Sequence, residues 1–584
     1  LHKVDGFEQP LVAMHATTPQ EDRALADTIA AYRMQPTFEA LTAFERFVKD
    51  YPQSGWRVGV LANLGLAYYR QGYFSRAIDA WERAWQAEKS RPADNPMGKM
   101  LADLAIGELA RMHSRLGHAD ALEKLFIDLN GRPMSGPATE LITGAHESLW
   151  MFRNEYDKAY LCGPMALKSL LISLKSDAEK IAIMDAARSG PYGFSLAQVS
   201  ELASKADVPH ELIFRTPDQP LPVPSVVNWK LNHYAAIVGE RDGLYHVQDP
   251  TFASGDAWLT REAIDAEASG YFLVPAKTRK LSSWRLATPD EAKRVYGMGQ
   301  TNTNQMGGTK TVDNTVKTNP KCNGCSCPMC DVKAKTRLVG LNLNDTPVGY
   351  QPPKGPSAKI RLTYNQREAS QPANFSFFNI SPKWTLNVLS WIQDNPTSPG
   401  QSVLRYAAGG GSVDYSDGYS YSSASGAFSP ERQGQAVLVR IPATGPATSY
   451  ELRMPDGSKQ VFSQNDGATR FPRRIFLTQI VDPAGNTLTL NYDERLRLSS
   501  LTDATGRNTI FSYDFPANPL LVTKIADPFG RHADLTYDDS GRLAAITDVI
   551  GITSSFKYDA GGLVNEMTTP YGTHHFIYGQ NIYE

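Results

Sequence analysis

The chain has 584 residues, of which 41% are hydrophobic and 21% are charged. This length exceeds what one hydrophobic core usually serves, so we expect several domains. The 59 basic and 61 acidic residues give a formal net charge of −2, which provides no electrostatic reason to expect a nucleic-acid partner or an anionic membrane surface. No apolar run approaches the length that crosses a bilayer, so we expect no membrane span.

Composition changes along the chain and divides it into regions. Residues 1–20 are predicted to be an N-terminal tail, and the first third of the chain is rich in Ala, Leu and charged residues. After about residue 335 the chain is rich in Gly, Ser, Thr, Asn, Pro and Tyr, which is a switch from helix-forming to strand-forming and turn-forming residues. The sequence starts at Leu1 instead of Met and ends at Glu584 inside a repeating pattern, so we expect a piece of a longer protein.

Residues 21–136 carry paired segments with apolar residues at helical spacing. One predicted helix runs from Leu61 and stops at Gly72, and a second runs from Ala77 to Trp85. Similar patterns lie on both sides of this pair. Such helix pairs resemble tetratricopeptide repeats, and the resemblance implies a groove that docks a peptide or a partner protein. The alternative is a helical cap on the next domain, and the pattern favours neither.

The strongest chemical signal is Cys162-Gly163-Pro164, followed by apolar residues that repeat every three or four positions. The pattern predicts an amphipathic helix that begins at the cysteine, with the proline in its first turn. A helix N-terminus favours a thiolate, and a thiolate is a nucleophile. Without further partners, Cys162 would be interpreted as a small buried residue.

A candidate base for this thiol lies on a predicted strand, residues 231–239, which carries His233. After a turn at Asp242-Gly243, a second strand over residues 244–248 ends at Asp249. Antiparallel pairing of these strands would bring His233 and Asp249 to one side. Asp249 would then hold the imidazole while His233 takes the thiol proton.

A Cys-Gly-Pro that opens a helix, a strand with His and then an Asp-Pro pair resemble the papain-fold bacteriocin-leader peptidases, over about residues 150–275. We therefore predict an α+β papain-like cysteine peptidase domain at residues 137–280. The resemblance implies that Cys162 is the nucleophile, His233 the base and Asp249 the group that orients the base. It also implies a peptide substrate and no required cofactor.

The predicted site departs from this family at one position. The family usually has a Gln six residues before the cysteine, whose side chain donates to the oxyanion, and here that position is Tyr156. Asn154 is a nearby amide, although its spacing is wrong. Loss of one oxyanion donor typically costs on the order of a hundredfold in rate. The departure therefore leaves open a slow peptidase or a domain that only binds.

Residues 281–335 are predicted to be a flexible linker, rich in Asn, Thr and Gly, that contains four cysteines: Cys322, Cys325, Cys327 and Cys330. Four thiols this close can hold one Zn²⁺ or form two short disulfides, and the spacing favours disulfides modestly. In either case Cys162 remains free. Because the linker directly follows the predicted peptidase domain, we hypothesise that it reaches the cleft and is cut there.

The remaining chain is predicted to be all-β, with a β-rich region at residues 336–470 and repeats at residues 471–584. In the repeats, an Asp turn is followed ten residues later by Tyr-Asp: Tyr492-Asp493, Tyr513-Asp514, Tyr537-Asp538 and Tyr558-Asp559. These repeats resemble the YD repeats of Rhs toxins, toxin-complex cocoons and teneurins. The resemblance implies stacked hairpins that start a β-shell, with an open spacer sheet as the alternative. It also implies a bacterial protein that is secreted, periplasmic or on the cell surface.

Two functions follow from these predictions. The first is a thiol peptidase that acts on a glycine-rich segment of its own chain or of a partner protein. The second is a non-catalytic encapsulation and docking module with a degenerate peptidase fold.

Overall fold

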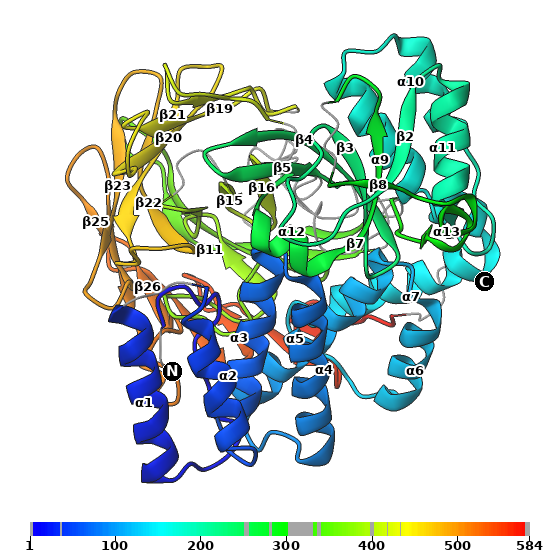
Figure 1. The fold of residues 1–584 in the computed structure, drawn as a ribbon. Coiled ribbons are helices and arrows are strands. Elements are labelled where there is room, and N and C mark those ends of the chain that lie inside the picture. Colours follow the sequence, from blue (N-terminus) through cyan, green and yellow to red (C-terminus); the bar gives the residue numbers. More distant parts are fainter. Residues whose placement is uncertain are drawn as a thin grey trace.

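A computed structural model gives the fold of the chain (Figure 1). The structure describes residues 4–34, 38–249, 256–278, 283–301, 331–335, 340–397, 402–416, 419–432 and 434–578. The four cysteines predicted to bind Zn²⁺ or to pair as disulfides lie outside these ranges.

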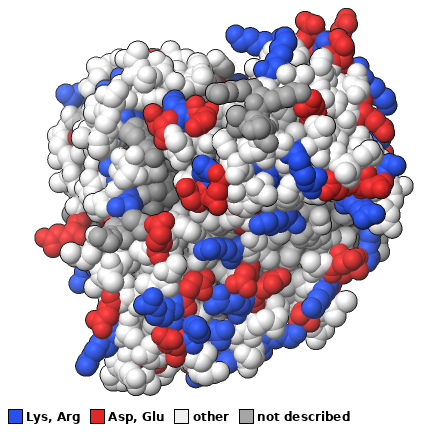
Figure 2. All heavy atoms as spheres, in the orientation of Figure 1, with Lys and Arg blue, Asp and Glu red and all other residues white. Residues whose placement is uncertain are grey.

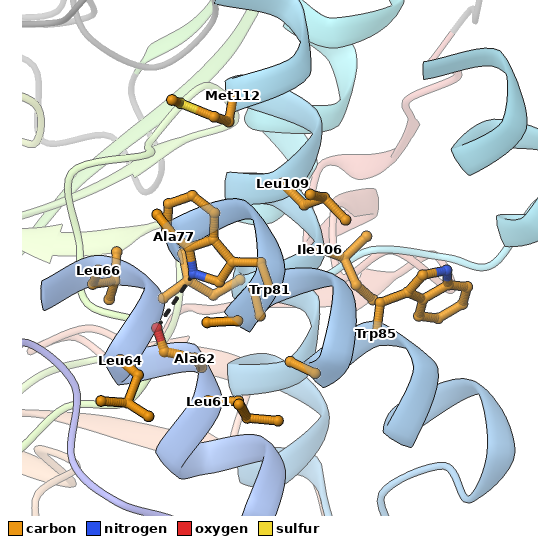
Figure 3. Close-up of a cluster of buried hydrophobic side chains, with 14 of the residues drawn as sticks. Leu61, Ala62, Leu64, Leu66, Ala77, Trp81, Trp85, Ile106, Leu109 and Met112 are labelled. Carbon is orange, nitrogen blue, oxygen red and sulfur yellow. Dashed lines mark hydrogen bonds between the residues drawn. The ribbon is translucent and has the colours of Figure 1, made fainter. Parts of the chain in front are cut away.

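The N-terminal part of the chain is helical. Its helices are α1 (Pro19–Met34), α2 (Leu41–Asp50), α3 (Arg57–Arg70), α4 (Phe74–Ser90), α5 (Pro96–Arg115), α6 (Ala119–Leu129) and α7 (Ala138–Asn154). The Trp81 indole lies between α3 and α4 and donates to the Ala62 carbonyl at 3.3 Å (Figure 3). A methyl group at Gly65 would lie 2.2 Å from that indole nitrogen, so only glycine lets the two helices approach this closely. The helical class is as predicted, and its assignment to tetratricopeptide repeats stays a prediction.

An α+β part follows. Its helices are α8 (Tyr156–Ala159), α9 (Cys162–Ser173), α10 (Ala178–Asp185), α11 (Leu196–Lys205), α12 (Arg261–Glu267) and α13 (Pro289–Arg294). Its strands are β1 (Phe194–Ser195), β2 (His210–Phe214), β3 (Ser225–Trp229), β4 (His233–Arg241), β5 (Leu244–Gln248), β6 (Asp256–Thr260), β7 (Ala268–Pro275), β8 (Arg285–Leu286) and β9 (Tyr296–Gly297).

Within the described residues, the main sheet of this part is antiparallel and has the strand order β6-β5-β4-β3-β7-β2-β8. Helix α9 packs on β3 and β4 through side chains at positions three and four apart, including Leu167 and Leu170, which are fully buried. This packing holds the start of α9 close to the start of β4. The two predicted strands around residues 231–248 are β4 and β5, and they pair as expected.

Part of the predicted linker is folded: residues 285–297 form β8, α13 and β9. Thr288 and Glu291 make a reciprocal capping box that starts α13. Ala292 is then buried against the α+β core, and β9 pairs with β1. Composition alone did not reveal these long-range contacts.

The C-terminal part is all-β. In the described residues, a four-stranded sheet contains β10 (Asp331–Lys335), β11 (Gly340–Tyr350), β12 (Ala358–Asn365) and β13 (Trp384–Leu386). A second sheet has eighteen strands: β14 (Trp391–Asp394), β15 (Leu404–Tyr406), β16 (Ser412–Asp414), β17 (Tyr421–Ser422), β18 (Ala427–Phe428), β19 (Val437–Ile441), β20 (Ser449–Arg453), β21 (Lys459–Asn465), β22 (Arg473–Val481), β23 (Thr487–Tyr492), β24 (Leu498–Thr502), β25 (Asn508–Ser512), β26 (Lys524–Ala526), β27 (His532–Tyr537), β28 (Leu543–Thr547), β29 (Thr553–Tyr558), β30 (Val564–Thr569) and β31 (Gly572–His575).

Strands of the large sheet follow one another in chain order, and the pairings between its described strands are antiparallel. One additional pairing joins β14 to β22, so that strands β14 to β22 form a closed ring. Strands β23 to β31 then extend the sheet one strand at a time. The sheet is the large antiparallel one that the sequence predicts, and its membership of a closed shell stays a prediction.

The tyrosines of the four Tyr-Asp pairs and the aspartates at the turns have local structural roles. The Tyr hydroxyl donates to a backbone carbonyl fifteen residues earlier, at 2.5–2.9 Å, in Tyr492, Tyr513, Tyr537 and Tyr558. Aspartates at the turns accept backbone N–H groups two and four residues later, as in Asp482, Asp493, Asp503, Asp527, Asp538, Asp548 and Asp559. The tyrosine therefore ties a strand to the preceding strand, and the aspartate closes the turn.

The three parts pack together. In Figure 1 the helices α1 to α5 lie below the α+β part, with the all-β part beside both. Glu267 at the end of α12 accepts hydrogen bonds from the backbone and the hydroxyl of Ser75, and Arg367 of the all-β part pairs with Glu140 of α7. On the face in Figure 2, acidic and basic side chains are interspersed. Within the described ranges, no helix has the length and apolar character that crossing a membrane requires.

Candidate active site

Cys162 is the first residue of α9, in the position that the sequence predicts. Pro164 lies in the first turn of the helix, where its missing N–H group costs no hydrogen bond. The thiol is buried, with 1% of the residue exposed, and it forms no disulfide within the described part of the chain. Access of a substrate to the sulfur is therefore controlled by the residues that cover it.

His233 begins β4, and Asp249 follows directly after β5. The pairing of β4 with β5 places Ala236 opposite Gln248, which aligns these two ends of the hairpin. The His233 Nε2 atom lies 2.6 Å from Asp249 Oδ2, and both residues are buried. The hairpin thus fixes the orientation of the imidazole.

The thiol and the imidazole also interact. Burial of His233 disfavours its charged form, but the Asp249 carboxylate and then Cys162, both by charge and by hydrogen bonding, outweigh it and raise the pKa of His233 to about 10. These two partners therefore favour the protonated imidazole. The structure therefore brings the Cys162 thiol, the His233 imidazole and the Asp249 carboxylate together at one site.

A segment of the same chain covers these residues. We call residues Val295–Gln300 the strap; it follows α13 and includes β9. The backbone N–H of Leu196 donates to the Val295 carbonyl at 2.8 Å, and β9 pairs with β1. The Asn228 amide donates to the Tyr296 carbonyl at 2.9 Å. The strap is therefore held as an added strand along the α+β part.

Gly299 of the strap lies against the thiol and the imidazole. Its backbone N–H points at the Cys162 sulfur, with the nitrogen 3.1 Å from Sγ. The Cys162 backbone N–H donates to the Gly299 carbonyl at 3.2 Å. A methyl group at Gly299 would lie 2.0 Å from His233 Nδ1 and 3.1 Å from Cys162 Cβ. No residue larger than glycine fits here without displacing the imidazole.

The helical part supplies the opposite wall of this site. The Arg115 carbonyl at the end of α5 accepts from the Gln300 backbone N–H at 2.8 Å. Gly117, in the turn between α5 and α6, lies so close that a methyl group there would be 2.0 Å from the Met298 carbonyl oxygen. The strap thus runs between the helices and the α+β part, a contact that no local sequence signal indicates.

The weaker predicted residue Asn154 is exposed at the end of α7. Its side-chain amide donates to the Trp150 carbonyl at 2.8 Å, in the last turn of the same helix. The structure does not bring it together with the other three residues. Tyr156, at the position where the resembling family has Gln, is 39% exposed. The one donor that the structure places on the Gly299 carbonyl is the Cys162 backbone N–H, among the hydrogen bonds of the described residues.

Family models match two regions of the chain. Residues 155–280 match the Peptidase C39 family, and residues 537–574 match the RHS repeat. The two matches lie in the regions that the sequence predicts to be a cysteine peptidase domain and YD repeats.

A search of solved structures finds a double glycine motif protease from an AMS/PCAT transporter, crystallised in complex with its leader peptide. The two chains are 19% identical, with a TM-score of 0.17, and the match covers 20% of this chain and 84% of the other. No curated protein matches the chain.

Proposed function

We propose that this chain is a cysteine peptidase in which Cys162 is the nucleophile, His233 the general base and acid, and Asp249 the group that orients and charges His233. The observation that carries this proposal is the 2.6 Å contact between His233 Nε2 and Asp249 Oδ2, on an imidazole whose charge is also stabilised by Cys162. A buried histidine with only a structural role would not need both a carboxylate and a thiol as partners.

Each group has a defined task in this mechanism. The sulfur attacks the carbonyl carbon of a peptide, with its proton held by His233. The Cys162 backbone N–H stabilises the oxyanion that forms, because this N–H already points at a carbonyl oxygen in the structure. His233 then gives the proton to the leaving amine, and water hydrolyses the thioester. Asp249 keeps the imidazole in one orientation through both steps.

The substrate is a peptide with glycine at the reacting position. A methyl group at the position of Gly299 collides with the imidazole, so a side chain on the acyl residue would push His233 out of place. The substrate lies either in this chain or in a partner protein.

The test uses a synthetic peptide with the sequence of Thr288–Thr301. Purified chain is incubated with it, and the products are identified by mass spectrometry. We expect hydrolysis by the unmodified chain after its strap has left the cleft, and none by Cys162→Ala or His233→Ala. The same rate with Cys162→Ala would disprove the peptidase function.

The second candidate is a non-catalytic docking module. Tyr156 in place of the family's Gln favours it, because a second side-chain donor to the oxyanion is then lost. In that case Cys162 would hold the strap without cutting it, and the peptide test above would give no product with any variant.

We also propose an arrangement for the all-β part, the N-terminal helices and the four clustered cysteines. The RHS match and the chain-order sheet of β14 to β31 support a β-shell wall, in a protein that acts outside the cytoplasm of a bacterium. The helices α1 to α7 would then be tetratricopeptide-like repeats that dock a partner, and Cys322, Cys325, Cys327 and Cys330 would form disulfides or hold Zn²⁺. Electron microscopy of the chain would test the wall, because an open flat sheet would contradict it.

A further inference from the structure

We propose that the strap is the substrate of its own domain, and that the peptide bond between Gly299 and Gln300 is cut in cis. This inference rests on the proposed peptidase function and adds the identity of the bond. It follows from where the strap places its backbone relative to Cys162 and His233.

The first support is the alignment of the Gly299 backbone with Cys162. The Gly299 nitrogen lies 3.1 Å from the sulfur, and the Gly299 oxygen lies 3.2 Å from the Cys162 nitrogen. The Gly299 carbonyl oxygen thus already lies on the Cys162 N–H, the donor that would stabilise the oxyanion if the sulfur attacked this carbonyl. An inert cover over a thiol needs no such alignment.

The second support is that two glycines of the strap lie too close to their neighbours for a side chain to fit. A methyl group at Gly297 would lie 2.2 Å from the Tyr234 ring and 3.0 Å from the Cys162 sulfur. A methyl group at Gly193, beside β1, would lie 2.0 Å from the Gly297 carbonyl oxygen. Together with Gly299, these positions leave no room for a side chain on the strap beside Cys162 and His233.

The third support is that the strap is anchored on both sides of the proposed cut. Before it, the Met298 backbone N–H donates to the Asn232 carbonyl at 2.8 Å, and the Tyr234 hydroxyl donates to the Val295 carbonyl at 3.0 Å. After it, the Gln300 N–H donates to the Arg115 carbonyl at 2.8 Å. Such anchoring on both sides holds the bond in place and lowers the entropic part of the barrier.

The reaction consumes one water molecule. The Cys162 sulfur bonds to the Gly299 carbonyl carbon while its proton stays on His233, and the carbon–nitrogen bond to Gln300 breaks as His233 protonates that nitrogen. The products of this step are a thioester at Gly299 and a free amine on Gln300. Water then attacks the thioester, His233 takes one water proton and returns it to the sulfur, and Gly299 leaves as a carboxylic acid that gives its remaining proton to the solvent.

The test is the intact mass of the purified chain after incubation, with terminal sequencing of the fragments. We expect one cut, with fragments that end at Gly299 and begin at Gln300, and a single uncut mass for Cys162→Ala. Gly299→Ala should slow the cut on the order of a hundredfold, because the methyl group displaces His233 or the strap. Gly434→Ala is the matched control, since a methyl group there has no neighbour closer than 3.8 Å.

A trans assay separates failure of this inference from failure of the peptidase function. The methyl group of Gly299→Ala pushes the strap away from Cys162, so we expect this variant to cut the peptide of residues 288–301 although it cuts itself about a hundredfold more slowly. If the unmodified chain stays whole while Gly299→Ala cuts the peptide, the domain is a peptidase and the strap is only its cover, which overturns the inference. If neither cuts anything, the peptidase function itself is wrong. A cut at any bond other than Gly299–Gln300 also overturns the inference.

Discussion

Asp249 determines the charge of His233. Burial alone would lower the pKa of this imidazole, yet the carboxylate and Cys162 raise it to about 10, above the value of about 6.5 that an unfolded histidine has. Since the folded pKa is raised, the protonated pair stabilises the fold fully below about pH 6.5. That contribution is lost as the pH rises through about 10.

Replacing Asp249 by Asn tests this charge. The variant keeps the size of the side chain but removes the charge that favours imidazolium, so the pKa of His233 should fall. We expect the melting temperature of Asp249→Asn to lie below that of the unmodified chain at pH 7, and the gap to narrow above pH 10. Self-cleavage at pH 7 should fall by about 10³–10⁴-fold. If the difference in melting temperature between the two proteins did not depend on pH, the Asp249 carboxylate would not set the charge of His233.

The repeat tyrosines make a prediction for stability. The Tyr513 hydroxyl donates to the Leu498 carbonyl at 2.9 Å. Tyr513→Phe keeps the ring and removes the donor, so it should lower the free energy of unfolding by about 1 kcal/mol. Tyr571→Phe is the control, because Tyr571 is 77% exposed. The measurement is urea unfolding, and an equal loss for both variants would show that the hydrogen bond contributes nothing.

At the scale of elements, the turn between α5 and α6 packs directly against the strap. Gly117→Ala should therefore slow self-cleavage at least tenfold, because its methyl group would lie 2.0 Å from the Met298 carbonyl oxygen.

Gly131, after α6, is its matched control. Both glycines have a φ of +71°, but a methyl group at Gly131 meets nothing within 4 Å. Each substitution carries the same backbone cost of roughly 1–2 kcal/mol, so only the contact with the strap differs. The rates are compared by intact mass at equal times, and equal slowing would mean that backbone strain alone is responsible.

The elements around the site could largely be predicted from the sequence. The helix at Cys162 and the hairpin between His233 and Asp249 have strong local signals: a proline in the first turn, a Gly turn and apolar alternation. The structure brings those residues together, and their catalytic roles remain a prediction. The strap could not be predicted, because β9 has only two residues. The backbone partners of Met298 and Gln300 are Asn232 and Arg115, which lie far away in the chain. The glycines of the strap are typical of a linker, which is how the sequence alone was interpreted.

At the scale of the whole molecule, the proposed cut would not separate the chain into two free halves. Arg367 pairs with Glu140, the Asn374 amide donates to the Met97 carbonyl at 3.0 Å, and the Arg70 guanidinium lies 3.8 Å above the Phe471 ring. These contacts join residues before Gly299 to residues after Gln300 and do not depend on the peptide bond between them.

We therefore expect the two fragments to migrate as one species in size-exclusion chromatography and to separate only under denaturing conditions. Glu140→Ala combined with Asn374→Ala should weaken this association, and the unmodified, cleaved chain is the control. Fragments that separate spontaneously after cleavage would show that the covalent link alone had held the parts together.

The extra pairing of β14 with β22 has a consequence for how the molecule folds. This pairing places Trp391 opposite Phe476 and closes strands β14 to β22 into a ring. The ring can close only after the intervening strands have formed, and closure of so long a loop is slow. Strands β23 to β31 pair only with their neighbours in the chain and can be added one after another on a finished template. The ring would then act as the nucleus of the sheet, and amide hydrogens in β14 and β22 should be the last of the sheet to exchange with solvent.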